Sequence, residues 1–264
     1  GVQTCALPIS RVRTFLAPSP ANYVLPVRLL GASVPYSFTR CAPIRELDPF
    51  FYQASDPATD AFHWFSFLSV PTDRKEDRVC QILVSWPFRR GFLGREEPSD
   101  TPAAEDRVAW MKEVTKGWVE PFRSIVADIP EGTDVKSLAL EDWLPAEEGF
   151  DSRDGRVTLI GDAAHAMTMC MSPFSVFYDM LLTTPLVRGE AANHGIADVA
   201  SLVKELFAET NANTPGPIDR YAAEMIPRAR IAVLNSRRAC MDAHDHKKIC
   251  ETSPLVARRV IVLE

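Results

Sequence analysis

The residues that could do chemistry are concentrated where a short apolar stretch, residues 156–160, runs directly into Gly161 and Asp162. A carboxylate at the C-terminal end of a strand can accept hydrogen bonds from a ribose hydroxyl, as acidic residues do in dinucleotide-binding folds. Gly161, and Gly189 further along the chain, permit close approach of the backbone to a cofactor, because a Cβ at either position would collide with it. This pattern favours a site for a nucleotide cofactor.

A helix is predicted to begin directly after Gly189, with Ala192 and Asn193 in its first turn. The first N–H groups of a helix have no partner within the helix and carry partial positive charge. They favour an anion, such as a phosphate or the N1/C2=O region of a reduced flavin. This second feature agrees with a nucleotide cofactor beside Asp162.

Several other polar positions are better explained by structure than by chemistry. His165 is interpreted as a structural loop residue rather than a catalytic base, and Asp198, inside a predicted helix, as a packing or capping partner. His244 and His246 are a weak hint of a metal site. No cysteine or carboxylate cluster lies at ligand spacing beside them, so a solvated helix end is the preferred interpretation.

Branched and aromatic residues predict the strands of the chain. We expect strands at Tyr23–Ala32, Trp64–Val70 and Val79–Trp86, and the polar loop Pro71–Arg78 joins the last two into an antiparallel hairpin. Residues 156–160 (RVTLI) are expected to form a further, buried strand that returns after the first helix.

Helices are predicted at Ala104–Val119, at Glu190–Phe207 and from Ile218 onward. In the second of these, apolar residues recur at helical spacing at Ile196, Val199, Val203, Leu206 and Phe207. The order of a strand-rich stretch, a helix, a returning strand and further helices indicates an α/β or α+β enzyme built from two lobes.

The composition is that of an ordinary globular protein, with 264 residues, 46% of them hydrophobic. A net charge of -6, with scattered Lys and Arg, argues against nucleic acid as a partner. No apolar run reaches the roughly 18 to 20 residues that a membrane span needs. The six cysteines form no CxxC pair and are widely spaced, which is typical of a reducing compartment, and we expect a cytoplasmic protein.

A known family is indicated by two runs, GRVTLIGDAAHAMTM and RGEAANHGIADVASL. They resemble the GD-motif region of class A flavoprotein monooxygenases, the relatives of p-hydroxybenzoate and salicylate hydroxylases. Residues 10–13 (SRVR) resemble the tail of the family's DGxxSxVR motif, with Arg13 as the motif arginine. Tyr221 with residues 227–229 (PRA) resembles its C-terminal helix signature. The resemblance covers most of the chain.

The resemblance implies FAD as the cofactor and NAD(P)H as the co-substrate. NADPH would reduce FAD, O₂ would react with the reduced flavin, and an aromatic or similar small organic substrate would be hydroxylated. Asp162 would bind the FAD ribose, and residues 189–193 would lie along the isoalloxazine. No catalytic side chain or metal is implied. The implied cofactor-binding residues are Arg13, Gly161, Asp162, Gly189, Ala192 and Asn193.

The implied fold is an α/β (α+β) one, a partial FAD/NAD(P)-binding Rossmann-like domain with an inserted mixed β-sheet domain that binds the substrate. We expect residues 10–24 and 146–264 to belong to the FAD-binding domain. Residues 25–145 would form the substrate-binding sheet domain.

The chain departs from the family pattern in three places. No GxGxxG precedes a βαβ unit, so we expect the C-terminal part of such an enzyme, without the N-terminal half of its flavin-binding domain. Residues 1–9 (GVQTCALPI) resemble a translated sequencing adapter. Residues 170–187 intervene where the family has about one residue, and we interpret them as a retained intron or as a genuine loop.

Two other functions stay open at this point. The chain could be an inactive fragment that binds no flavin tightly, because uncovered strand edges and apolar faces invite aggregation or pairing with a partner. It could also be a flavin-dependent reductase that shares the FAD-binding fold.

Overall fold

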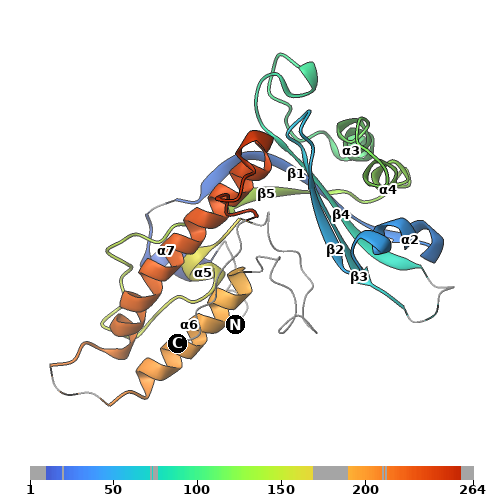
Figure 1. The fold of residues 1–264 in the computed structure, drawn as a ribbon. Helices are drawn as coiled ribbons and strands as arrows, with labels where there is room; N and C mark the ends of the chain where they lie inside the picture. Colours follow the sequence, from blue (N-terminus) through green and yellow to red (C-terminus); the bar gives the residue numbers. More distant parts are fainter. Residues whose placement is uncertain are drawn as a thin grey trace. The chain divides into compact units, whose positions relative to one another are not determined.

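The computed structural model describes residues 10–19, 21–71, 73, 77–168, 190–209, 211 and 213–256 (Figure 1). The chain divides into two compact units. The first, here called the helical unit, comprises Gly1–Leu25, Glu141–Met241 and Cys250–Glu264. The second, called the sheet unit, comprises Pro26–Leu140 and Asp242–Ile249.

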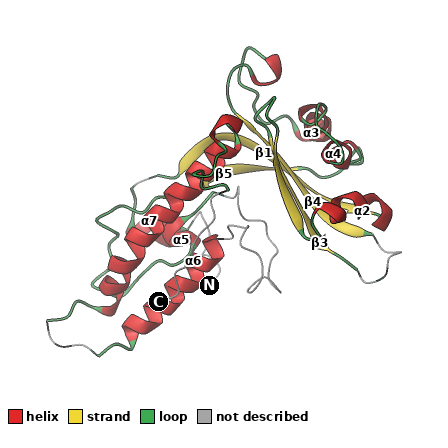
Figure 2. Ribbon diagram, in the orientation of Figure 1, coloured by secondary structure: helices red, strands yellow, loops and turns green. Residues whose placement is uncertain are grey.

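A five-stranded sheet with the order β2-β3-β4-β1-β5 dominates the sheet unit (Figure 2). Its strands are β1 (Tyr23–Tyr36), β2 (Phe51–Ser55), β3 (Phe62–Ser69), β4 (Arg78–Pro87) and β5 (Lys136–Asp142). β1 pairs antiparallel with β4, β3 with β4, and β2 with β3. The three predicted strands and the predicted hairpin are therefore confirmed, whereas β2 and β5 were not predicted separately.

Three helices pack on this sheet and close its core. They are α2 (Phe38–Leu47), α3 (Arg107–Val114) and α4 (Phe122–Ala127). One apolar cluster joins them to the strands, with Ile44 from α2, Met111 from α3, Ile125 from α4 and Trp86 from β4 all buried. Burial of such side chains, at about 25 cal/mol per Å² of apolar surface, is the main force that holds these layers together.

The predicted helix at Ala104–Val119 is correct only in its middle. It begins as a short 3₁₀ turn, η3 (Ala104–Asp106), and α3 then ends at Val114. The hydroxyl of Thr115 donates to the carbonyl oxygen of Met111, 3.0 Å away. Side-chain hydrogen bonds of this kind compete with the helical pattern, and residues 115–117 form a turn instead.

The helical unit is built from α1 (Arg11–Leu16), α5 (Asp162–His165), α6 (Glu190–Leu206) and most of α7 (Pro217–Ala243) (Figure 1). The predictions of α6 and α7 are confirmed. The two helices lie side by side. Arg220 of α7 donates to the carboxylate of Glu205 of α6, and Ser201 of α6 donates to Glu224 of α7. Two further 3₁₀ turns, η2 (Phe92–Gly94) and η5 (His246–Lys248), lie in the sheet unit.

The prediction of a strand at residues 156–160 is wrong, because the structure has no strand there. A strand needs a hydrogen-bonded neighbour, and no described residue pairs with this segment. Arg156 instead belongs to a turn, and its N–H donates to the carbonyl of Ser152. Leu159 is buried in the apolar cluster of the helical unit, which also contains Tyr221 and Ala163.

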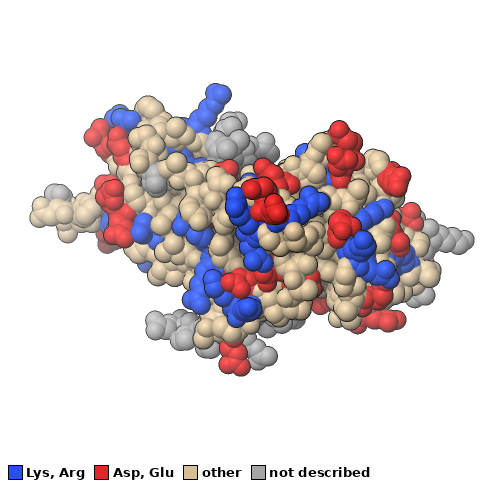
Figure 3. Space-filling view, turned by 90° about the horizontal axis from the view of Figure 1, so that it is seen from above, with Lys and Arg blue, Asp and Glu red and all other residues tan. Residues whose placement is uncertain are grey.

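The described helices include none that is long and apolar enough to cross a membrane. On the face drawn in Figure 3, basic and acidic side chains intermingle over the surface. Such a mixed surface agrees with the scattered charges of the sequence.

Candidate functional site

The backbone turns sharply at Gly161. Gly161 has φ 57° and ψ -141°, a conformation that residues with a Cβ rarely adopt. α5 begins at the next residue, Asp162, and the N–H groups of Ala164 and His165 donate to the carbonyl of Gly161. The glycine therefore places Asp162 at the first position of a short helix. We call residues 161–165 the GD turn.

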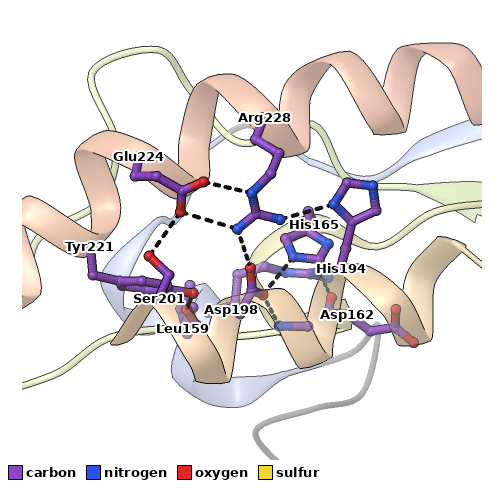
Figure 4. Close-up of polar contacts among 11 residues, drawn as sticks. Leu159, Asp162, His165, His194, Asp198, Ser201, Tyr221, Glu224 and Arg228 are labelled. Carbon is purple, nitrogen blue, oxygen red and sulfur yellow. Dashed lines mark hydrogen bonds and ion pairs between the residues drawn. The ribbon is translucent and has the colours of Figure 1, made fainter. Parts of the chain in front are cut away.

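The carboxylate of Asp162 is half-buried and points away from the other polar groups of the turn (Figure 4). Among the described residues, no hydrogen-bond donor reaches it. Burial raises the pKa of Asp162, and the charges of His165 and Arg13 oppose that rise. The structure thus holds an acceptor group in place, and within the described part of the chain both of its oxygens are without a donor.

Arg13 lies beside Asp162 although 149 residues separate the two in the sequence. Its guanidinium donates to the carbonyl oxygen of Asp162 at 3.3 Å and to the side chain of Asn22 at 3.0 Å. Ser10 caps α1 by accepting the N–H of Arg13, and the guanidinium stacks over the ring of Trp143. Burial lowers the pKa of Arg13, and the nearby charges of Asp162 and Glu141 oppose that change.

A buried carboxylate, Asp198 of α6, forms hydrogen bonds with the GD turn (Figure 4). One oxygen accepts the N–H of Gly161 and lies 2.7 Å from Nε2 of His165, and the other accepts from Arg228 at 2.8 Å. Burial alone would raise the pKa of Asp198, but these hydrogen bonds outweigh it and hold the pKa below its usual range. The carboxylate is therefore ionised at neutral pH and fixes both ends of the turn.

Arg228 of α7 extends this network to two more side chains (Figure 4). It donates to Glu224 at 2.8 Å and to Nδ1 of His194 at 2.9 Å. A guanidinium can only donate, so Nδ1 of His194 is the acceptor in this contact. Burial would lower the pKa of Arg228, but the hydrogen bonds to Glu224 and Asp198 raise it above the ordinary value.

The sequence analysis treated His165 and Asp198 as structural residues, and the hydrogen bonds support that interpretation. His165 is, however, the last residue of a helix and not part of a loop. The roles of Arg228 and His194 were missed. The available signals were the spacing of Glu224 and Arg228, four residues apart, and an aspartate in the middle of an amphipathic helix, which needs a cationic partner when buried.

The remaining predicted cofactor residues are only partly described. Ala192 and Asn193 are exposed near the start of α6. Gly189, together with residues 1–9 and 170–187, lies outside the described residues. Within the described residues, Gly195 lies against Gly161: an added Cβ at Gly195 would lie 3.8 Å from Cα of Gly161, an ordinary van der Waals distance.

The interpretation of His244 as part of a solvated helix end is wrong, whereas His246 is exposed as expected. Nε2 of His244 lies 2.8 Å from the hydroxyl of Ser85, and its ring packs against Phe62. The polar ring is buried because Ser85 provides a hydrogen-bond partner inside the sheet unit. Within the part of the chain that the structure describes, no three His, Cys, Asp or Glu side chains are grouped to hold a metal ion.

Comparison with known proteins links this geometry to one family, although no family model matches the chain. The chain is 44% identical, over 90% of its length and 54% of the relative's, to an Arthroderma benhamiae protein named "Probable FAD-dependent monooxygenase". It is 32% identical to the FAD-dependent monooxygenase tazP of Aspergillus terreus, over 78% of this chain and 48% of that protein. The chain thus spans about half the length of the curated relatives it matches.

A solved structure supports the same fold. HpxO from Klebsiella pneumoniae, complexed with FAD and uric acid, matches 92% of this chain and 52% of its own chain, with a TM-score of 0.63 and 18% identity. The predicted fold class, an α/β (α+β) flavin-binding fold with a sheet domain, is confirmed by this match and by the observed architecture. The chain is therefore a homologue of the FAD-dependent monooxygenases over about half of their length, and it has the fold of the class A flavin hydroxylases.

Proposed function

We propose that this chain is the part of an FAD-dependent monooxygenase that holds the ribose of FAD at Asp162. The whole protein would hydroxylate an aromatic or similar small organic substrate, with NAD(P)H as reductant and O₂ as the oxygen source. The observation that carries the proposal is the carboxylate of Asp162, which is fixed by the GD turn but has no hydrogen-bond donor among the described residues. Two ribose hydroxyls would supply the missing donors.

The residues around Asp162 fit this cofactor. A half-buried carboxylate whose pKa is raised by burial gains stability when hydrogen bonds reach its ionised form. Arg13 contacts the backbone of Asp162 and so would orient the carboxylate rather than neutralise it. The clamp by Asp198 keeps the turn in the conformation that glycine allows. These residues would bind and orient FAD, and FAD when bound would supply the activation of O₂.

Ala192 and Asn193 are proposed to contact the flavin ring from the start of α6, and Gly189 is proposed to let the backbone approach it. Both described residues are exposed, so their surfaces are free to meet a ligand. The substrate class is supported by the solved HpxO structure, which contains uric acid, a planar ring compound. We accordingly propose a planar, electron-rich ring as the substrate, bound by the sheet unit.

Replacement of Asp162 tests the ribose contact directly. Asp162→Ala should weaken FAD binding by the full chain at least about tenfold, because a charge-assisted hydrogen bond contributes roughly 1.5–3 kcal/mol. Flavin fluorescence during titration of FAD measures the affinity. The matched control is Asp154→Ala, since the carboxylate of Asp154 is 90% exposed and its partner is the exposed Arg156. Equal FAD affinity in wild type and Asp162→Ala would contradict the proposal.

As the alternative, we propose that this chain by itself binds no flavin tightly. It is favoured by the length of the chain, about half that of its relatives, and by the exposed apolar face of α6. The visible absorption spectrum of the purified full chain tests it. One flavin bound per chain would rule out this second proposal, and NAD(P)H-dependent O₂ uptake would then support the monooxygenase.

A further inference from the structure

Two cysteines that are far apart in the sequence lie in contact inside the sheet unit. Cys41 of α2 and Cys80 of β4 are 39 residues apart in the chain, and their Sγ atoms are 3.7 Å apart. Both side chains are fully buried. Both are free thiols, because the sulfur atoms of a disulfide are only about 2.05 Å apart. The proposed binding of FAD uses neither of them.

Positively charged side chains lie near this pair. The guanidinium of Arg78 lies over the ring of Phe38 of α2, 4.5 Å from its centroid, and Arg40 directly precedes Cys41. The hydrogen bond with the thiol of Cys80 lowers the pKa of Cys41; burial opposes this change, and the charges of Arg78 and Arg40 add to it. The same hydrogen bond raises the pKa of Cys80, and burial raises it further. Cys41 is therefore the thiol that ionises more readily, and the thiolate is the reactive form of cysteine.

The backbones that carry the two thiols are held with different firmness. Cys80 lies inside the sheet, where it pairs with Val34 of β1 on one side and with Phe67 of β3 on the other. α2 has ten residues, of which two are buried, and Cys41 is one of these two. Pro43 inside α2 has no N–H to donate, so the helix lacks one of its hydrogen bonds. α2 is thus the element that can move by the short distance that a bond between the sulfur atoms requires.

We propose that Cys41 and Cys80 form a redox site, at which a hydroperoxide converts the two thiols into a disulfide that ties α2 to β4. The thiolate of Cys41 attacks one oxygen of the peroxide, the O–O bond breaks, and Cys41 becomes a sulfenic acid. The thiol of Cys80 then attacks the sulfur of that acid, the S–S bond forms and water leaves. With hydrogen peroxide, the two thiols lose two electrons, and the peroxide is reduced to two molecules of water. A dithiol reductant reverses the change.

Proximity distinguishes this pair from the other cysteines that the structure describes. Cys240 is also fully buried but belongs to α7, and Cys250 is exposed. A sulfenic acid at Cys41 has the thiol of Cys80 within 3.7 Å, so the second step is intramolecular. The inference stands apart from the proposed function, since α2 and β4 lie together in the sheet unit and no flavin takes part.

Peroxide treatment of the full chain tests the site without any need for activity. The protein is incubated with hydrogen peroxide, unfolded, alkylated with iodoacetamide and digested, and mass spectrometry then identifies the state of each cysteine. We expect a cross-linked pair of peptides that contain Cys41 and Cys80 and that dithiothreitol separates, whereas Cys240 is alkylated. Oxidation of the exposed Cys250 shows that the peroxide is active.

Cys80→Ser separates the two steps of the reaction. Without the second thiol, Cys41 should stop at the sulfenic acid and be captured by dimedone. The matched control is Cys240→Ser, at a buried cysteine of α7, which should leave the cross-link unchanged. In the wild type, oxidation should lower the equilibrium constant of unfolding in urea at least about tenfold, because the disulfide closes a loop of the unfolded chain. The same treatment should give no such gain in Cys80→Ser.

Three results would overturn the proposal. The first is complete alkylation of Cys41 and Cys80 in a sample whose Cys250 is oxidised, and the second is a disulfide from either thiol to another cysteine. The third is a cross-linked protein that unfolds as readily as the reduced one, because the bond would then not tie α2 to β4. All three are measured on the wild type, so they decide the proposal even if Cys80→Ser fails to fold.

Discussion

Two fully buried histidines of this protein stand in opposite surroundings. In the helical unit, Nε2 of His165 lies 2.7 Å from the carboxylate of Asp198. In the sheet unit, His63 lies edge-on to Tyr52 and against Trp118, and burial lowers its pKa to about 3. The GD turn is thus held by a buried carboxylate that is paired with Arg228, whereas the core of the sheet keeps a titratable group neutral.

The difference shows what each region is built to do. A buried carboxylate is stable only while every donor keeps its place, so the network around Asp198 fixes one backbone geometry beside Asp162. The aromatic core around His63 is held by buried area and ring contacts, which tolerate small shifts of a neutral side chain. The two regions should therefore respond differently to substitution and to pH.

The largest expected effect is the loss of the carboxylate of Asp198. Asp198→Ala leaves Arg228, His165 and the N–H of Gly161 without their acceptor in a buried site, so we expect the free energy of unfolding to fall by roughly 3–5 kcal/mol. Urea unfolding of the full chain, followed by circular dichroism, measures this change.

Asp198→Asn keeps one acceptor oxygen and the shape of the side chain, and we expect a smaller loss. The folded pKa of Asp198 is depressed, so the stability from its ionised form is present above the ordinary aspartate pKa and is lost as pH falls through the folded pKa. In both variants, the free energy of unfolding should lack the decrease at acid pH that protonation of Asp198 causes in the wild type. If Asp198→Ala were as stable as the wild type, the buried carboxylate would not be what holds the GD turn, and the contrast with the core of the sheet unit would be wrong.

The next effect is the pH dependence that His63 imposes. Because its folded pKa of about 3 lies below the ordinary value of about 6.5, the unfolded chain takes up a proton that the folded chain cannot. Its contribution to stability is complete above pH 6.5 and declines as pH falls towards 3. Between about pH 7.5 and 5, the free energy of unfolding should fall by roughly 2 kcal/mol from this group.

His63→Phe removes the titrating group and keeps an aromatic ring in the core. The stability difference between wild type and this variant should therefore change by roughly 2 kcal/mol over the same pH range. Urea unfolding at the two pH values supplies the four free energies. A difference that does not vary with pH would mean that His63 has the same pKa in the folded and the unfolded protein, so that burial in the sheet core does not keep it neutral.

The sequence predicted these two regions unequally. The strands around His63 were predictable because branched and aromatic residues are concentrated in them. The GD turn was found from its residue types, and the family resemblance assigned Arg13 and Asp162 to one cofactor without predicting the contact between them. The partners of Asp198 were not predictable, because Arg228 and His194 lie on two helices whose rotation about their own axes is set by tertiary packing.

The pattern of apolar residues also led to incomplete or wrong predictions in two segments. Ile196 and Val203 predict a helix correctly, but they face outward, because periodicity identifies an apolar face without saying what covers it. Residues 156–160 have the composition of a strand, yet a strand exists only when a neighbour supplies hydrogen bonds. Both failures come from partners that local sequence does not specify.

The smallest effect separates charge from ordinary hydrogen bonding inside the helical unit. The hydroxyl of Tyr221 donates to the carbonyl oxygen of Leu159 at 3.0 Å, a neutral contact within the same apolar cluster. Tyr221→Phe should lower the free energy of unfolding by about 1 kcal/mol, the net value of one such bond. Tyr23→Phe, at a more exposed tyrosine, is the control and should leave stability unchanged.

The stability loss of Tyr221→Phe, compared with that of Asp198→Ala, shows whether buried charge or any hydrogen bond holds the GD turn. If Tyr221→Phe costs far less than Asp198→Ala in the same urea experiment, the geometry beside Asp162 depends on buried charge. If the two substitutions cost the same, any lost hydrogen bond loosens the helical unit, and the charges around Asp198 have no special part in holding the turn. The neutral bond is therefore the reference against which the charged network has to be measured, because both lie against the same short segment of backbone.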